Sequence, residues 1–271
     1  MLIGHLTDLH MVAEGQRLGK VLDVNALVRR AVETINAEPV PPAFVVVTGD
    51  LTHSGTREET VQARLALDAL AMPYFAMPGG HDDPEIFSEV FGRHAWRDDG
   101  SGDIRYVVDD YSVRLVVADT TAGKGRKPEF GAERCAWLEE VLAAAPDSPT
   151  LLAIHHPPFQ CRIPVATYVE DFTVSWADGL RDVVRRHPQI QTVICGHVHR
   201  ATHVRWAGTM ASIGPSTSVQ SDPLFSDFSG DGQVGIRGRL ALEPGGWQGL
   251  WWDGEALLNI GLLTDRSYAR Y

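Results

Sequence analysis

Short apolar runs recur along this chain, and each of them ends in a polar cluster. The runs have the length of β-strands and are bounded by Gly, Pro, Asp or His. They span residues 2–6, 44–47, 74–77, 115–117, 151–154 and 192–195. Between several of them lie segments whose apolar residues have helical spacing, at 21–35, 61–70 and 132–145. Strands that alternate with helices indicate βα units and a largely parallel sheet.

The pattern changes after residue 200. Apolar runs at 202–206, 209–213, 239–242 and 247–252 indicate strands without helices between them, so we expect antiparallel sheet in this part of the chain. The segment 215–235 is rich in Ser, Asp and Gly, which predicts a long surface loop. The expected fold class is therefore α/β with an antiparallel portion, that is, a mixed α+β arrangement.

Aspartate and histidine residues follow five of the predicted strands. In open α/β sheets the residues at the carboxyl ends of the strands line the crevice where ligands bind. These strand ends carry Asp8, His10, Asp50, His81, His155, His156, His197 and His199. In extended backbone, residues i and i+2 point to the same side, so Asp8 and His10 can face one site, as can His197 and His199.

Imidazole and carboxylate groups without a thiolate predict a site for zinc, manganese, iron or cobalt rather than for calcium or magnesium alone. Two such ions bridged by one carboxylate form the clamp used for in-line displacement at phosphorus, and Asp50 is the natural bridge. Taken singly, Asp-x-His or Gly-Asp at a strand end is more often a solvated turn. Their occurrence together, in this order and all at strand ends, favours the metal site.

The composition excludes several other classes of protein. The chain has 271 residues, of which 44% are hydrophobic, enough for one large domain or two small ones. The net charge of −11 argues against binding to duplex nucleic acid, which needs clustered Lys and Arg. Three widely spaced cysteines do not resemble a disulfide framework. The chain shows no secretory signal and no apolar window of membrane-spanning length, so we expect a cytoplasmic protein that does not enter membranes.

A set of ordered motifs resembles the calcineurin-like metallophosphoesterases, in particular their class III cyclic-nucleotide phosphodiesterase and glycerophosphodiesterase branch. The motifs are HLTDLH (5–10), TGDLTHSG (48–55), PGGHDD (78–83), HHPPF (155–159) and CGHVHR (195–200). Supporting similarities are ADT (118–120), the GAERCAWLEEVL segment from residue 131 and GPSTSVQ (214–220). The resemblance covers about residues 1–220.

The resemblance implies a four-layer αββα sandwich of two mixed β-sheets flanked by helices. Residues 1–220 would form the catalytic domain, and 221–271 a C-terminal β extension packed on it or at an oligomer interface. One metal ion would take Asp8, His10, Asp50 and His199. The other would take Asp50, His156, His197 and an asparagine of the family's Gly-Asn-His-Asp motif.

The resemblance also implies a mechanism in which a metal-bound hydroxide attacks phosphorus. His81 would hydrogen-bond or protonate the departing oxygen, helped by the nearby Asp82. The asparagine of the family motif is missing, because Gly80 stands at its position. Glycine offers no side-chain ligand, which predicts a weakened second metal site, completed by water or by the substrate. Gly80 is either a natural divergence or an introduced substitution, and the pair Gly79-Gly80 also fits a tight turn that needs positive φ.

The substrate is less narrowly defined than the reaction. After HHPPF the chain lacks the glycine-rich turn and Met-Asp pair that related phosphodiesterases often show, so a cyclic nucleotide such as 3',5'-cAMP, a glycerophosphodiester, another small diester and a phosphonate monoester all stay open. The candidate substrate contacts are His81, Arg162, Tyr168, Phe172 and His203.

The C-terminal segment 245–271 contains Trp247, Trp251, Trp252 and Tyr268 among several Leu and Ile residues. We expect this apolar segment to form a homo-oligomer interface rather than a simple intramolecular sheet. The leading hypothesis for function is a phosphodiesterase with two divalent ions. The alternative is a protein of the same fold that has lost catalysis through its second site and serves as a binding or scaffold protein.

Overall fold

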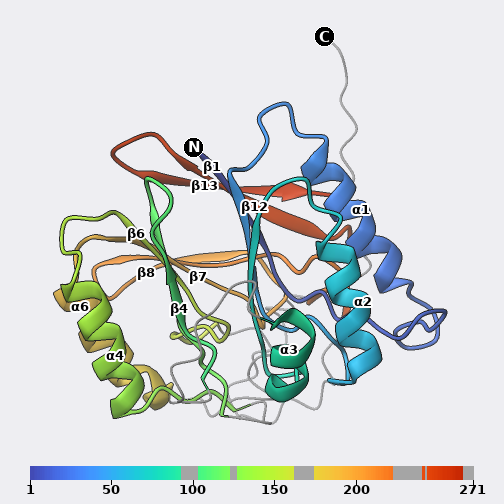
Figure 1. The fold of residues 1–271 in the computed structure, drawn as a ribbon, viewed down its shortest axis with the longest axis horizontal. Coiled ribbons are helices and arrows are strands. Elements are labelled where there is room, and N and C mark those ends of the chain that lie inside the picture. The colour runs from blue at the N-terminus through green and yellow to red at the C-terminus, as the bar shows by residue number, and fades with distance from the viewer. Residues whose placement is uncertain (93–102, 123–126, 162–173, 222–239, 242, 265–271) are drawn as a thin grey trace, which may run out of the picture.

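The fold comes from a computed structural model that describes residues 1–92, 103–122, 127–161, 174–221, 240–241 and 243–264. In Figure 1 two β-sheets lie in the middle of the molecule, with helices α1 and α2 on one side and α4 and α6 on the other. This arrangement confirms the predicted class, two mixed sheets flanked by helices.

The first sheet has the strand order β13-β12-β1-β2-β3. Its strands are β1 (Leu2–Leu6), β2 (Phe44–Thr48), β3 (Tyr74–Met77), β12 (Gly246–Trp252) and β13 (Leu257–Leu263). β1, β2 and β3 are parallel, whereas β12 is antiparallel to both β1 and β13. The carboxyl ends of the three parallel strands therefore lie at one edge of the sheet.

The second sheet has the order β4-β5-β6-β7-β9-β8. Its strands are β4 (Tyr106–Val108), β5 (Arg114–Val117), β6 (Thr150–Ala153), β7 (Ile190–Cys195), β8 (Thr202–Trp206) and β9 (Thr209–Ile213). The pairs from β5 to β9 are parallel, and β4 and β8 close the two edges in antiparallel fashion. A short pair, β10 (Gln220–Ser221) and β11 (Leu240–Ala241), lies outside both sheets.

The helices cover the outer faces of the sheets. They are α1 (Val24–Asn36), α2 (Arg57–Leu67), α3 (Pro84–Phe91), α4 (Ala132–Ala143) and α6 (Asp178–Arg186), with a 3-10 turn η2 (Ser175–Ala177) before α6. Side-chain caps fix the start of several helices: Asp23 accepts a hydrogen bond from the Ala26 amide in α1, and Thr56 and Glu59 form a capping box in α2.

Two clusters of buried hydrophobic side chains hold these layers together. The larger one joins both sheets and α1, and contains Ile3, Val32, Leu115, Leu151 and Ile194. The smaller one packs α4 and α6 on the outer face of the second sheet, with Leu138, Leu180 and Val193 among its members. Strands buried on both faces explain why the sequence shows continuous apolar runs rather than alternation.

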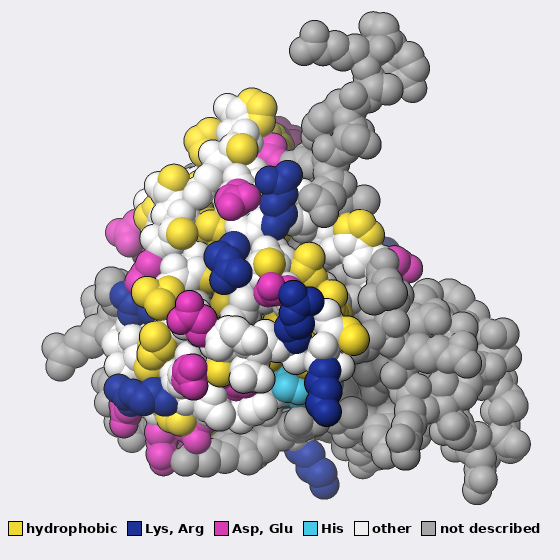
Figure 2. Space-filling view, turned by 90° about the vertical axis from the view of Figure 1, so that its right-hand side faces the viewer, with side chains coloured by type: hydrophobic (Ala, Val, Ile, Leu, Met, Phe, Trp, Pro, Cys, Tyr) yellow, Lys and Arg dark blue, Asp and Glu magenta, His cyan; other side chains and the backbone are white. Residues whose placement is uncertain are grey.

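The outward face of α1 and α2 is polar and carries charges of both signs. Lys and Arg side chains alternate there with Asp and Glu, and hydrophobic side chains are scattered between them (Figure 2). Helix α1 has an Arg30–Glu33 pair, and Arg64 in α2 pairs with Asp68. Exposed pairs of this kind contribute little to stability. They identify the face as the solvent side of an amphipathic layer.

Two expectations about the C-terminal part are wrong. The start of the predicted surface loop is not at the surface: Ser216, Thr217 and Ser218 are buried, and their hydroxyl groups lie among polar partners below the cluster of strand ends. The second expectation favours an oligomer interface over an intramolecular sheet for the segment 245–271, but β12 pairs with β1 inside the first sheet, where Trp247 and Trp252 are buried. Tyr268 lies outside the described residues.

Candidate metal centre

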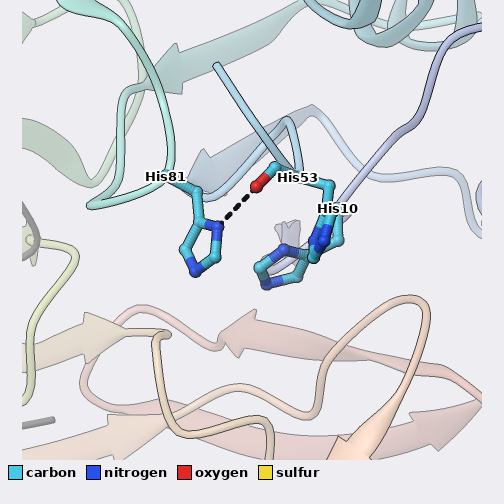
Figure 3. A group of neighbouring side chains, drawn as sticks. All are labelled: His10, His53 and His81. Carbon is cyan, nitrogen blue, oxygen red and sulfur yellow. Dashed lines mark hydrogen bonds between the residues drawn. The ribbon is translucent and has the colours of Figure 1, made fainter. Parts of the chain in front are cut away.

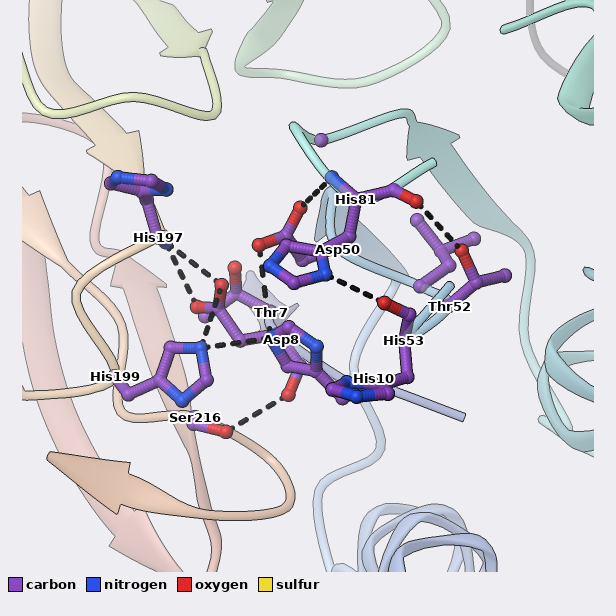
Figure 4. Close-up of polar contacts among 12 residues, drawn as sticks. Thr7, Asp8, His10, Asp50, Thr52, His53, His81, His197, His199 and Ser216 are labelled. Atoms are coloured by element: carbon purple, nitrogen blue, oxygen red, sulfur yellow. Dashed lines mark hydrogen bonds and ion pairs between the residues drawn. The ribbon is translucent and has the colours of Figure 1, made fainter. Parts of the chain in front are cut away.

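The predicted ligands gather where the carboxyl ends of the two sheets face each other. Asp8 and His10 follow β1, and Asp50 follows β2. The other sheet contributes residues that follow β6 and β7, namely His155, His156, His197 and His199. Figure 4 shows the side chains from β1 and β2 pointing toward those of the loop after β7.

A first group contains Asp8, His10, Asp50 and His199, with one ligand atom of each residue within 4.8 Å of the others. The Nε2 atoms of His10 and His199 are 2.9 Å apart. Nε2 of His10 lies 3.7 Å from Asp50 Oδ2, and Nε2 of His199 lies 3.5 Å from Asp8 Oδ1. The sequence prediction placed these same four residues around one ion.

A second group contains His155, His156 and His197, again with one ring nitrogen of each within 4.8 Å of the others. Nδ1 of His156 lies 3.0 Å from the hydroxyl oxygen of Thr120, whose oxygen also accepts a hydrogen bond from the His156 amide. Nδ1 of His155 lies 2.7 Å from the Thr48 carbonyl oxygen. Both rings are fully buried, so their orientation is fixed by these contacts.

Asp50 lies between the two groups. Its Oδ2 atom faces His10, and its Oδ1 atom lies 3.3 Å from Nε2 of His155. Burial opposes the ionisation of Asp50, but the rings of His155 and His10 outweigh burial and hold the pKa of Asp50 well below its usual range. Burial alone would lower the pKa of His155, but the Asp50 carboxylate outweighs it and raises that pKa to about 10. Burial, reinforced by the His199 ring, holds the pKa of His10 well below its usual value.

The backbone is strained at the candidate ligands. Among the described residues, eight non-glycine residues have positive φ, and five of them are Asp8, His10, Asp50, His197 and His199. Each such conformation costs on the order of 1–3 kcal/mol, and clusters of them are typical of functional sites. The left-handed turns let the chain leave each strand while the side chain points back toward the opposite sheet.

Hydroxyl groups of the GPSTSVQ segment support the strained turn at Asp8. The side chains of Ser216 and Ser218 both donate to the Asp8 carbonyl oxygen, at 2.9 and 3.0 Å. The Asp8 carboxylate accepts the amide hydrogen of His197 at 2.9 and 3.0 Å (Figure 4). Asp8 thereby ties the end of β1 to the end of β7 and to the segment after β9.

His81 lies at the side of the first group. Its Nδ1 atom is 2.7 Å from the His53 carbonyl oxygen, and its amide donates to Asp50 Oδ1 at 2.9 Å. Since a carbonyl oxygen only accepts, Nδ1 of His81 carries the hydrogen and Nε2 is left to face other groups. A ring nitrogen of each of His10, His53 and His81 lies within 4.8 Å of the others, as Figure 3 illustrates.

Asp82 does not join these side chains. Its Oδ1 atom accepts hydrogen bonds from the amide and hydroxyl of Thr52, and its Oδ2 atom accepts from the amides of Leu51 and Gly79. Burial, reinforced by the nearby Asp50, raises the pKa of Asp82 to about 6. The carboxylate links the loop after β2 to the loop after β3 through these hydrogen bonds. It therefore stabilises the two loops and does not lie beside the Nε2 atom of His81.

The two glycines of PGGHDD have different roles. A Cβ atom on Gly79 would lie 2.3 Å from both the amide nitrogen and Oδ1 of Asp50, so only glycine fits there. Gly80 is half-buried, and neither glycine is among those with positive φ in the described residues. The expected turn with positive φ is therefore not what requires glycine at residue 80.

Of the remaining predicted substrate contacts, the structure describes only His203, which does not lie in this cluster. His203 lies on the edge strand β8 as an exposed residue, where its Nδ1 atom is 3.0 Å from the Ser212 hydroxyl oxygen. Arg162, Tyr168 and Phe172 lie outside the described residues.

Comparison with known proteins decides the family. The model of the calcineurin-like phosphoesterase family matches residues 1–201, a range that contains every candidate ligand described above. The chain belongs to the calcineurin-like phosphoesterase family. This finding confirms the resemblance inferred from the ordered motifs and the prediction of a metallophosphoesterase.

Two relatives and one solved structure illustrate the placement within this family. The glycerophosphodiester phosphodiesterase GpdQ of Enterobacter lignolyticus is 33% identical, over 81% of this chain and 78% of that protein. A probable cyclic nucleotide phosphodiesterase of Rhodopseudomonas palustris is 36% identical, over 75% of this chain and 73% of that protein. A dimetal phosphatase of Danio rerio shares the fold, with a TM-score of 0.70, 14% identity and coverage of 98% of this chain and 96% of that one.

The side chains of this phosphoesterase suit divalent cations by their spacing. Nitrogen ligands about 2.1 Å from a shared cation lie roughly 3 to 3.4 Å apart. The contact between the Nε2 atoms of His10 and His199, at 2.9 Å, and that between His155 and Asp50, at 3.3 Å, are close to this range. The donor set is imidazole and carboxylate throughout, as zinc, manganese, iron and cobalt prefer.

Several residues at the centre of this phosphoesterase had no role in the sequence prediction. His53 and Thr120 stood inside quoted motifs, and Ser216 and Ser218 were placed in a surface loop. His155 is among the strand-end residues that predict a metal site, but the family resemblance gives it no ligand role. The sequence does contain a signal for His155, namely the pair of adjacent histidines, because both residues follow a buried strand and can lie near its end.

Among the described residues, no helix is both long and apolar enough to span a membrane. The three cysteines, Cys135, Cys161 and Cys195, all lie among the described residues and form no disulfide bond.

Proposed function

We propose that this phosphoesterase is a metal-dependent phosphodiesterase that hydrolyses a small phosphodiester, either a glycerophosphodiester or a cyclic nucleotide such as 3',5'-cAMP. The names of the relatives support this substrate class, since one is a glycerophosphodiester phosphodiesterase and another a probable cyclic nucleotide phosphodiesterase.

The observation that carries the proposal is the position of Asp50 between two ligand groups. One carboxylate oxygen faces His10 of the first group and the other faces His155 of the second. A carboxylate in this position can bridge two cations. Two bound divalent ions (Fe, Mn, Zn or Co) would polarise the phosphoryl oxygens and lower the pKa of water so that it can act as the nucleophile near neutral pH.

The protein's own residues orient the substrate and handle the proton of the leaving group. Asp8, His10, Asp50 and His199 would hold the first ion, and Asp50, His156 and His197 the second. His81 has its Nδ1 hydrogen bound by the His53 carbonyl, so the ring presents Nε2 from the side of the loop after β3. In the imidazolium form, which carries a second proton on Nε2, it would give that proton to the departing alkoxide oxygen and become neutral, which is general-acid chemistry.

The second ion would lack the ligand that an asparagine at residue 80 would supply. On that basis we expect it to bind more weakly than in a Gly80→Asn variant. Because the φ angle at Gly80 is not positive, an asparagine is compatible with the backbone there. Titration with Mn²⁺ should show tighter binding of the second equivalent in Gly80→Asn, and unchanged affinity would contradict the ligand role of this position.

The substrate class is tested with a panel of esters and added Mn²⁺. The panel contains cAMP, glycerophosphoethanolamine, bis(p-nitrophenyl) phosphate and, as a comparison, the monoester p-nitrophenyl phosphate and a phosphonate monoester. We expect turnover of at least one diester, faster than that of the phosphate monoester. No turnover of any ester would favour the alternative, a binding or scaffold protein of the same fold.

We also propose a homo-oligomer that uses the C-terminal strands. Trp251, Leu258 and Ile260 are 38%, 53% and 51% exposed, and they lie on the β12–β13 hairpin at the free edge of the first sheet. Light scattering after size-exclusion chromatography should give the mass of a dimer or a larger assembly, and a monomer at all concentrations would reject the proposal. We also propose a cytoplasmic, reducing location, which three cysteines without a disulfide bond support.

A further inference from the structure

The missing ligand at Gly80 raises the question of which neighbouring side chain can take its place. A replacement must reach the second group, face Asp50 and have a lone pair directed at the site. The described residues offer one side chain that meets all three conditions and that the family resemblance did not assign, His155. The inference below rests on the proposed two-cation function, because it concerns the second ion of that centre.

The tautomer of His155 follows from its contact with Thr48. Nδ1 of His155 lies 2.7 Å from the Thr48 carbonyl oxygen, and a carbonyl oxygen cannot donate. The hydrogen of a neutral ring is therefore on Nδ1, and the lone pair is on Nε2. Histidines that bind metals usually have this arrangement, with the second ring nitrogen donating to a backbone carbonyl or a carboxylate. His199 has the same arrangement, since its Nδ1 atom lies 2.9 Å from the Val219 carbonyl oxygen.

Nε2 of His155 is directed into the site. It lies 3.3 Å from Asp50 Oδ1, and apart from this contact it has no hydrogen-bond partner among the described residues. The ring is fully buried, and one of its nitrogens lies within 4.8 Å of a ring nitrogen of His156 and of His197. A buried nitrogen that faces a carboxylate and two other imidazoles is suitably placed to share a cation with them.

Two glycines make room for the ring. A Cβ atom on Gly49 would lie 2.6 Å from Nδ1 of His155, and one on Gly79 would lie 2.7 Å from its Cε1 atom. Both distances are too short for a real contact, so any side chain at either position would displace the imidazole. The ring thus packs directly against the PGGHDD turn, beside the residue whose side chain is missing.

We propose that His155 is a ligand of the second cation and occupies the coordination position that an asparagine at residue 80 would fill. The second ion would then be held by Asp50, His155, His156 and His197.

The experiment is a titration with Co²⁺ or Mn²⁺ alone of the chelator-treated full-length chain, read by calorimetry. The variants are His155→Ala, Gly80→Asn and the double variant. His187→Ala is the matched control, because His187 is a buried histidine that contacts Glu139 on α4 and belongs to neither ligand group. Circular dichroism with chelator present checks that each variant unfolds in the same cooperative transition.

We expect His155→Ala to weaken binding of the second equivalent by more than the 10- to 100-fold that is typical of residues that only orient a ligand, and to leave the first nearly unchanged. The two substitutions should be non-additive, because asparagine and His155 would compete for one position. Gly80→Asn should therefore raise second-site affinity by a larger factor in the His155→Ala background than in the wild type. Equal factors in both backgrounds, or an affinity of His155→Ala like that of His187→Ala, would overturn the proposal.

A crystal structure of the wild-type chain with zinc decides the same point without any variant. Anomalous difference density should place an ion about 2.0 to 2.1 Å from Nε2 of His155. An ion that binds His156 and His197 while Nε2 of His155 stays hydrogen-bonded to Asp50 would show that His155 only positions the carboxylate. Neither readout uses activity, so the assignment of His155 stands or falls separately from the proposed hydrolysis of diesters.

Discussion

Replacing Asp82 by asparagine tests whether this carboxylate holds the site together rather than taking part in catalysis. The buried side chain accepts hydrogen bonds from three amides, those of Leu51, Thr52 and Gly79, and from the Thr52 hydroxyl. An asparagine has one acceptor oxygen and one NH2 group. Its NH2 group must therefore point either at the amide and hydroxyl of Thr52 or at the amides of Leu51 and Gly79, all of which donate hydrogen bonds themselves.

The lower-cost orientation directs the NH2 group at Thr52, because the hydroxyl can rotate and accept while the oxygen keeps Leu51 and Gly79. One buried amide, that of Thr52, is then left without an acceptor, which costs about 1 to 3 kcal/mol. The remaining bonds lose their ionic component, but the neutral amide also avoids the cost of burying a charge, the cost that raises the pKa of Asp82 to about 6, so these two effects offset each other. We expect Asp82→Asn to lower the free energy of unfolding by about 1 to 3 kcal/mol.

The assay is urea unfolding at pH 7 with chelator present, so that metal binding does not contribute. The neighbouring Asp83→Asn variant is the control: Asp83 caps α3, and asparagine caps helices about as well as aspartate, so little change is expected. If Asp82→Asn loses less than about 0.5 kcal/mol, comparable to a surface substitution, the reasoning from buried hydrogen bonds is refuted.

Three further predictions concern separate parts of the molecule. His5 is buried, and burial lowers its pKa from 6.5 to about 4 despite the contact with Gln248, so the ring stays neutral in the folded protein. The free energy of unfolding should therefore fall by up to about 3 kcal/mol as the pH drops from about 6.5 to 4, because only the unfolded chain takes up the proton in this range. Urea unfolding measures this slope, and a His5→Gln variant with the same slope would contradict the prediction. Replacing Ser216 and Ser218 together by alanine removes both hydrogen bonds to the carbonyl oxygen of the strained Asp8. The affinity for the first cation, measured by calorimetry, should fall about tenfold, and an unchanged affinity would contradict the supporting role of these hydroxyls. His81→Ala should slow hydrolysis of glycerophosphoethanolamine by about 100- to 10,000-fold, but that of bis(p-nitrophenyl) phosphate far less, because p-nitrophenolate leaves without a proton. Equal losses in kcat for both substrates would argue against His81 as a proton donor.

The ends of the parallel strands could be predicted from the sequence because a local pattern encodes them. β1 and β3 begin and end at the predicted residues, and β2, β5, β6 and β7 differ by one or two. Apart from Leu2 and the half-buried first half of β3, the apolar runs are buried on both faces, and they end at the edge where ligands gather. The three-residue strand β4 was missed because so short a run has no periodicity of its own. Helix α6 was also missed, although Leu180, Val183 and Val184 lie on one buried face.

Features that depend on contacts between distant segments of the chain could not be predicted from the sequence. β12 joins the first sheet beside β1, so Leu2 pairs with Trp251, and nothing in the local pattern around Trp247 or Trp252 indicates that neighbour. The burial of Ser216 and Ser218 likewise depends on the Asp8 carbonyl, which lies more than 200 residues earlier in the chain.

The direction of each side chain within a turn could not be predicted from the sequence either. Asp82 follows His81 directly, yet its carboxylate bonds to amides of a different loop, while the His81 ring is held by the His53 carbonyl. Gly80 shows the opposite case, since the absence of a side chain is visible in the sequence itself. The sequence could not show which neighbour fills the place beside it, because that depends on how the rings of His155 and His156 pack against Gly79 and Thr120.

The most direct test of the central claim counts bound cations and turnover in one titration. Mn²⁺ is added to the chelator-treated chain while bound metal and hydrolysis of bis(p-nitrophenyl) phosphate are measured on the same samples. A phosphodiesterase with two cations bridged by Asp50 should stay nearly inactive through the first bound equivalent and gain its activity with the second. Full activity with one bound ion, or activity that does not depend on metal, would contradict the two-cation centre.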